Sequence, residues 1–93
     1  MNVANTGKNN TLQVMVRGPE GILFQGAASA ISSVNNSGPF DILPYHANFI
    51  SLIRDRVQII KPDKTVTTLP LQRGIIKNFE NTVDIFLGIE TVS

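Results

Sequence analysis

The sequence predicts an all-β domain, a two-sheet sandwich or barrel built from short strands. Several segments alternate apolar and polar residues with a period of two, which is typical of half-buried strands. Turn-forming glycine, proline, asparagine and aspartate separate these segments at intervals of about 8–12 residues. No segment carries a sustained helical period. We expect a flexible polar tail at 1–10 and a single domain at 11–93.

The first predicted strand covers 12–17, where apolar and polar positions alternate. Its inward positions are Leu12, Val14 and Val16. The turn that follows at 18–21 contains a proline, which fixes φ, between two glycines.

The second strand begins at Ile22. Its inward parity changes between Phe24 and Ile31, which predicts a β-bulge near Gly26. The residues at 26–30 are too small to fill a core, and we interpret them as an exposed edge.

The segment 38–47 is predicted to be a rigid surface loop with an apolar inner side. Pro39 and Pro44 each fix φ and lack a backbone donor, so neither fits a central strand. The residues between them predict a short edge strand of about four residues. The apolar positions of that strand are Phe40, Ile42 and Leu43. A preorganised loop loses little entropy on docking, which makes this segment the best candidate surface.

The C-terminal half predicts five more strands, at 49–53, 57–60, 65–69, 74–79 and 83–90. Pro62, Asp63 and Lys64 predict a hairpin turn, and Pro70 is expected to end the strand before it. A tight turn is expected at 80–82. In the last strand four positions share one face, namely Val83, Ile85, Leu87 and Ile89. Phe86 then lies on the opposite face as a possible contact.

Composition excludes several classes of protein. The net charge is +1 and the eight basic residues are scattered, whereas a nucleic-acid interface needs a basic stripe. There is no cysteine, so no disulfide framework or thiolate metal site is expected, which fits a cytosolic protein. No apolar run approaches the roughly 20 residues that span a bilayer, and the polar N-terminus is unlike a secretory signal.

Catalysis would have to use His46, the one histidine, with Asp41 orienting it and Ser37 or Ser51 as nucleophile. No nucleophile elbow or glycine-rich oxyanion turn accompanies them. A histidine beside Pro44 with a backbone hydrogen bond is the simpler interpretation. One imidazole without thiolates is also a poor zinc site. The residues alone therefore predict a binding or assembly module without bond chemistry, cofactor or metal.

Three separated blocks resemble the ε subunit of F-type ATP synthases, over about residues 12–90. The central block matches at Gly38, Phe40, Ile42, Leu43, Pro44, His46 and Ala47. The first block matches at Leu12, Val14, Val16, Pro19, Glu20, Gly21, Leu23, Phe24 and Gly26. The third block, in the C-terminal half, matches at Val57, Ile59, Gly74, Ile75, Ile76, Val83, Ile85, Phe86 and Leu87.

The resemblance implies a flattened two-sheet sandwich of about eight to ten strands. It implies a non-catalytic rotor subunit of the central stalk, which couples the γ subunit to the membrane c-ring during proton- or sodium-driven ATP synthesis. The implied interface with γ and the c-ring is Gly38, Pro39, Phe40, Asp41, Tyr45, His46 and Ala47. The implied anchors of the loop are Ile42, Leu43 and Pro44. No cofactor, small-molecule ligand or nucleic acid is implied.

The implied location is peripheral to a membrane, on the cytoplasmic side in a bacterium or on the matrix or stroma side in an organelle. The chain ends at Ser93, where the family usually continues into a helical hairpin, so we expect neither hairpin nor its ATP-binding and inhibitory roles. It also departs from the family pattern. Gln72-Arg73 replaces a serine-glycine pair, and Asp41 and Tyr45 stand where glycine is usual. The alternative is a stand-alone sandwich that binds a peptide or carbohydrate, with edge pairing at 27–30.

Overall fold

The computed structural model describes residues 10–88 and consists of seven β-strands joined by turns and one longer loop. The strands are β1 (Leu12–Gly18), β2 (Gly21–Ala28), β3 (Ala30–Asn35), β4 (Gly38–Ile42), β5 (Phe49–Ile60), β6 (Val66–Phe79) and β7 (Thr82–Leu87). The predicted all-β class is confirmed. Almost all of the predicted tail, and the end of the last predicted strand, lie outside the described residues. Over residues 10–88 no helix has the length and hydropathy of a membrane span.

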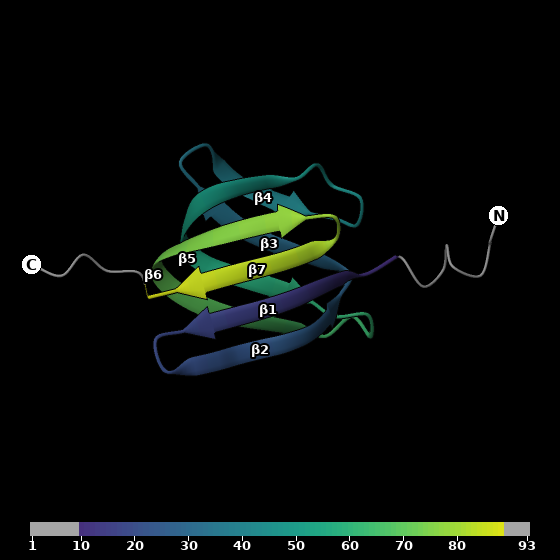
Figure 1. Cartoon of the computed structure of the whole chain (residues 1–93), viewed down its shortest axis with the longest axis horizontal. Coiled ribbons are helices and arrows are strands. Elements are labelled where there is room, and N and C mark those ends of the chain that lie inside the picture. The colour runs from purple at the N-terminus through teal and green to yellow at the C-terminus, as the bar shows by residue number, and fades with distance from the viewer. Residues whose placement is uncertain (1–9, 89–93) are drawn as a thin grey trace, which may run out of the picture.

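All seven strands belong to one continuous sheet in the order β2-β1-β7-β6-β5-β3-β4. Neighbouring strands are antiparallel except β1 and β7, which are parallel. The sheet folds over on itself, so that β1, β2 and β7 lie in front of β3 and β4 in Figure 1. Two layers of a sandwich therefore arise from a single hydrogen-bonded sheet.

The fold-over occurs within the two longest strands. β5 has 12 residues and β6 has 14, and their pairing shifts register between Ile53 and Asp55. The first half of β5 pairs with the second half of β6, next to β7. The second half of β5 pairs with the first half of β6 and with β3. We call this fold-over the crease. It explains why the structure has seven strands rather than eight to ten. The predicted strands at 49–53 and 57–60 form one bent strand, β5, and those at 65–69 and 74–79 form another, β6.

Pro70 does not end a strand, contrary to the prediction. It lies inside β6 and pairs with Arg56. β7 pairs only with Gly74–Phe79 of β6, so the first half of β6 has a strand on one side only. Proline lacks a backbone donor and is tolerated where a strand is locally an edge.

The core lies between the two layers and is mainly aliphatic. Leu12, Val14 and Val16 are buried, as predicted from their alternation. The rest of the buried cluster is Ala28, Ile31, Ile42, Ile53, Val57, Ile59, Ile76, Val83 and Ile85. Because both layers contribute buried side chains to this one cluster, the two layers pack together as a single body.

The predicted bulge lies at a different residue. Val16 pairs with Phe24 and Arg17 with Ile22, so the extra residue in β2 is Leu23, while Gly26 pairs regularly with Val14. The predicted edge is correct in that β2 ends the sheet, yet Ala28 at its end is fully buried.

Candidate functional site

The sequence singled out 38–47 as a surface loop, and the structure divides this segment into strand β4 (Gly38–Ile42) and a loop after it at 43–48. β4 is the last strand of the sheet, so the predicted edge strand is confirmed, but it includes Pro39 and ends before Leu43. Beyond β4 the chain turns tightly, and the amide of His46 donates to the carbonyl of Leu43 at 3.0 Å. Tyr45 occupies the left-handed region at φ 70°. This conformation favours glycine, which has no Cβ.

Three side chains tie this loop to the β6–β7 end of the sheet. Asn78 is buried, and its Nδ2 donates to the carbonyls of Ala47 at 3.0 Å and His46 at 3.3 Å. The amide of Tyr45 donates to Oδ1 of Asn81 at 2.6 Å. Oδ1 of Asn48 accepts from the amide of Glu80 at 2.8 Å. Because the bonds join segments over 30 positions apart, they fix the loop against the sandwich.

Aromatic rings fill the space beneath the loop. The rings of Phe40 and Phe49 meet edge to face with centroids 5.8 Å apart. The His46 ring lies 5.2 Å from Phe49, and its Nδ1 lies 2.9 Å from the carbonyl oxygen of Ala47. The inner side of the loop is thus apolar, which agrees with the prediction from its sequence.

The predicted interface residues differ in exposure. Asp41, Tyr45, His46 and Ala47 are exposed, as is Pro39, whereas Gly38 is half-buried. Phe40 is half-buried against the core, so much of its ring is turned inward.

Of the predicted anchors, Ile42 is fully buried and Pro44 half-buried. The prediction for Leu43 is wrong, because its side chain is 56% exposed and does not anchor the loop to the core. The buried Asn78 supplies much of the anchoring instead, and no pattern in the sequence indicated it.

A catalytic use of His46 finds no support in the geometry. Ser51 accepts from Nδ2 of Asn35 at 3.2 Å, and the amide of Ser37 donates to Asn35 at 2.8 Å. Among the described residues, neither serine nor Asp41 hydrogen-bonds to His46. Within the same residues, no group of three histidine, aspartate or glutamate side chains could hold a metal ion.

The outer face of the front layer carries an apolar surface that the sequence did not reveal as a unit. Leu52, Ile75 and Phe86 are direct cross-strand neighbours on β5, β6 and β7. Ile50 and Phe79 share this outward face, and the exposed fractions of Ile50 and Leu52 are each 67%. We call these five residues the outer band. Ile75 is half-buried and the other four are exposed, with Lys77 between Ile75 and Phe79 on β6. Exposed apolar side chains gathered on one face are typical of an interaction site on a small domain.

Charged groups lie both within the outer band, where Lys77 separates Ile75 from Phe79 on β6, and beside it. Lys77 faces Asp84 across β6 and β7, and Nη1 of Arg17 lies 4.0 Å from Oδ1 of Asp84. The Arg17 guanidinium lies 5.6 Å from the centre of the Phe86 ring. Apolar centres with polar rims are the usual anatomy of protein–protein interfaces.

The loop and the outer band form one continuous surface. A hollow is lined by Tyr45, His46, Ala47, Asn48, Glu80 and Asn81. A second hollow shares Asn48 and continues along Phe49, Ile50, Lys77, Asn78 and Phe79. Tyr45, which lines the first hollow, adds an exposed aromatic side chain past the end of the sheet.

Fold and surface together define a small β-sandwich domain with exposed apolar side chains gathered on one face. Residues 11–88 match the family model described as the ATP synthase delta/epsilon chain β-sandwich domain, and the chain belongs to this family. Among curated proteins, the ATP synthase epsilon chain of Nitratiruptor sp. is 32% identical over 73 residues, which is 77% of this chain and 57% of that one. The epsilon chain of Campylobacter fetus is 30% identical over 79 residues, covering 84% and 61%. The chain thus spans about three fifths of the length of these relatives.

Solved structures give the same fold at lower identity. A chain of the Euglena gracilis mitochondrial ATP synthase, in an assembly of OSCP, F1 and c-ring, matches with a TM-score of 0.75 at 20% identity. The match covers 84% of this chain and 51% of that one. A chain of the Tetrahymena thermophila central stalk and c-ring matches with a TM-score of 0.63 at 15% identity, covering 82% and 62%.

Proposed function

We propose that this chain is a rotor subunit of a rotary F-type ATP synthase, which joins the γ subunit to the c-ring. The observation that carries the proposal is the group of exposed apolar side chains in the outer band, which two hollows connect with the loop at 43–48. Its family membership supports the same role, since related chains are epsilon chains of ATP synthases. The subunit performs no bond chemistry itself, and it associates with the membrane peripherally, through the complex, on the side where γ lies.

Within this role, the exposed loop residues and the outer band have different tasks. The outer band offers flat apolar area, which suits a long apolar partner surface such as a helix of γ. The loop contributes Tyr45 and His46, with Leu43 added to the set because of its exposure. Aromatic side chains in such positions commonly carry a large share of binding energy.

The mechanism is mechanical, and its requirement is stiffness. Torque passes from the c-ring to γ without slip only if the domain between them does not deform. A core shared by both layers provides resistance to shear, because close-packed interiors are poorly compressible. The hydrogen bonds of Asn78 and Asn81 extend that stiffness into the loop.

The test is association with the γ subunit encoded by the same genome, measured by size-exclusion chromatography and calorimetry. The double variant Leu52→Thr/Phe86→Thr should weaken binding by about 2 kcal/mol or more, which is about 30-fold or more in Kd. Leu52 is 67% exposed, whereas Phe86 is 38% exposed and lies beneath the Arg17 guanidinium, so the free energy of unfolding should fall by about 1–2 kcal/mol and leave the chain folded.

Val66→Thr is the matched control, because Val66 is an equally exposed apolar residue at the far end of β6. It should leave the affinity for γ unchanged. No association of the wild-type chain with γ at micromolar concentration would contradict the rotor proposal. Equal weakening by Val66→Thr would mean that the outer band has no special part in docking.

A further inference from the structure

Asn78 is a polar side chain at a core position of the sheet. The buried positions in the second half of β6 alternate, namely Gly74, Ile76 and Asn78. The neighbours of Asn78 across the sheet are Phe49 on β5 and Val83 on β7. Asn78 itself is 1% exposed. The alternation that places Ile76 in the core predicts an apolar side chain at position 78 as well, so an asparagine there needs a reason other than packing.

One oxygen of this buried amide has no partner. Nδ2 of Asn78 donates to the carbonyls of His46 and Ala47, whereas Oδ1 accepts no hydrogen bond within residues 10–88. Ser33, the other buried polar side chain of these residues, is satisfied, because its Oγ donates to the carbonyl of Arg56 at 2.7 Å. A buried acceptor without a partner destabilises the fold, because it has lost its hydration. Asn78 therefore costs stability at its oxygen while it holds the loop at 43–48 through its nitrogen.

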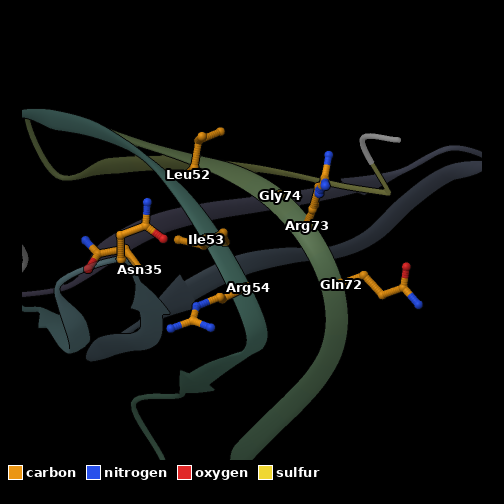
Figure 2. A pocket seen from close by; sticks show the side chains of 8 residues that line it. Asn35, Leu52, Ile53, Arg54, Gln72, Arg73 and Gly74 are labelled. Carbon is orange, nitrogen blue, oxygen red and sulfur yellow. The ribbon is translucent and has the colours of Figure 1, made fainter. Parts of the chain in front are cut away.

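Polar groups at the crease carry no such cost, because water reaches them. A hollow of about 310 Å³ lies there, and its lining includes Arg54, Gln72 and Arg73. All three residues are exposed, and Figure 2 shows their side chains projecting in different directions rather than towards one point. Within residues 10–88, the one buried side-chain polar atom without a partner is thus Oδ1 of the residue that tethers the loop.

We propose that Asn78 is a positioning residue, which sets the loop at 43–48 in the conformation that docks on γ. The identity of this partner rests on the proposed function, whereas the effect of Asn78 on the loop does not. Asn78 is too deeply buried to touch a partner, so it acts on binding only through the two carbonyls that it holds. A loop that is already ordered loses little entropy on docking, and a loop that is not held binds more weakly because its competent conformation is less populated.

The variant Asn78→Val separates the effect on the loop from the effect on the fold. Valine removes both hydrogen bonds to the loop together with the unpartnered oxygen, and it suits an inward strand position. The carbonyls of His46 and Ala47 belong to exposed residues, so water can replace the lost donor. We therefore expect the urea midpoint of the variant to equal or exceed that of the wild type.

Amide hydrogen exchange of the isolated chain gives the signature of the loop. The amide of Tyr45 donates to Asn81 and that of His46 to the carbonyl of Leu43. In Asn78→Val both amides should exchange about tenfold faster or more, while the amides of β1 and β7 should not exchange faster. Calorimetry with γ should show Kd raised about tenfold, with a larger unfavourable entropy of binding.

Ser33→Ala is the matched control, since it removes a buried side-chain bond to a carbonyl that joins β3 to β5 rather than to the loop. It should lower the urea midpoint and leave the exchange of Tyr45 and His46, and Kd for γ, at wild-type values.

A urea midpoint that falls in Asn78→Val as far as in Ser33→Ala, or a variant that does not fold, would make Asn78 a structural residue and overturn the proposal. Wild-type exchange at Tyr45 and His46 would overturn it as well. Faster exchange in the loop with an unchanged Kd would overturn the link between loop conformation and docking. Faster exchange in the variant, together with no γ binding by the wild-type chain, would support the effect of Asn78 on the loop and overturn the rotor role.

Discussion

Gly74 shows at the scale of one residue why the sheet can fold at the crease. A Cβ built there would lie 2.8 Å from the carbonyl oxygen of Phe86 and 2.9 Å from Cδ1 of Leu71. The carbonyl belongs to the β6–β7 ladder and cannot yield without breaking strand pairing. Glycine is therefore required by space at this position, whatever the backbone conformation.

Gly74→Ala should lower the free energy of unfolding by about 1–3 kcal/mol, the usual cost of overpacking. Urea denaturation followed by circular dichroism measures the change. Gly18→Ala is the control, because a Cβ at Gly18 meets only the flexible end of Leu23, at 3.2 Å. Equal stability of the two variants would show that the sheet relaxes around a methyl group at Gly74.

At the scale of the element, the hairpin between β5 and β6 depends on one carboxylate. Oδ1 of Asp63 accepts from Oγ1 of Thr65 at 2.6 Å and from its amide at 2.9 Å. The hydrogen bond from the Thr65 side chain, followed by that from its amide, holds the pKa of Asp63 below its ordinary value. The amide of Lys64 closes the turn on the carbonyl of Lys61 at 2.8 Å.

Thr65→Val should raise the pKa of Asp63 towards its ordinary value, because the first of these hydrogen bonds is lost. A carboxyl with a depressed folded-state pKa stabilises the fold above its unfolded pKa, and this contribution disappears as pH falls through the folded pKa. As the pH is lowered, the variant should therefore lose the stabilisation that the Asp63 carboxylate gives the hairpin at a higher pH than the wild type does. Carboxyl carbon shifts across the acid range give the pKa. An unchanged value would mean that the threonine hydroxyl does not act on Asp63.

The local sequence pattern predicted which segments form strands. It did not predict which neighbouring segments join into one longer strand. Alternation placed Leu12, Val14 and Val16 inward and Phe86 outward, because side-chain direction depends only on neighbours in sequence. The path of β6 through Pro70 depends on which strands lie beside it, which is a property of the whole sheet. Likewise, the outer band arises from registers between distant strands, and its members carry no shared motif.

The loop at 43–48 was predicted as a surface, but its anchoring was assigned to the wrong side chain. An apolar residue after an edge strand is ordinarily expected to pack inward, and Leu43 does not. The tight turn closed between Leu43 and His46 reverses the chain, and Asn78 holds it from 31 positions away. Long-range polar tethers leave no periodic signal in a sequence, so this part of the site needed the structure.

Hydrogen bonds from distant parts of the chain hold Tyr45 in a strained backbone conformation at the end of the sandwich that carries the loop at 43–48. Tyr45 is 65% exposed and sits at φ 70°, where a non-glycine residue costs about 1–2 kcal/mol. The bond from its amide to Asn81 and the neighbouring tether at Asn78 hold the backbone there. Asp55, Lys64, Glu80 and Asn81 also have positive φ, so what distinguishes Tyr45 is an exposed aromatic side chain held in that conformation.

Tyr45→Gly and Tyr45→Ala separate these two properties. Both remove the aromatic ring and should weaken binding to γ by a similar factor, about tenfold or more. Only glycine relieves the left-handed conformation, so Tyr45→Gly should be about 1 kcal/mol more stable than Tyr45→Ala in urea denaturation, even after the entropy of glycine in the unfolded chain is counted. Wild-type affinity in both variants would remove Tyr45 from the interface. Equal stability of the two would mean that the tethers at Asn78 and Asn81 do not hold the loop in its left-handed turn.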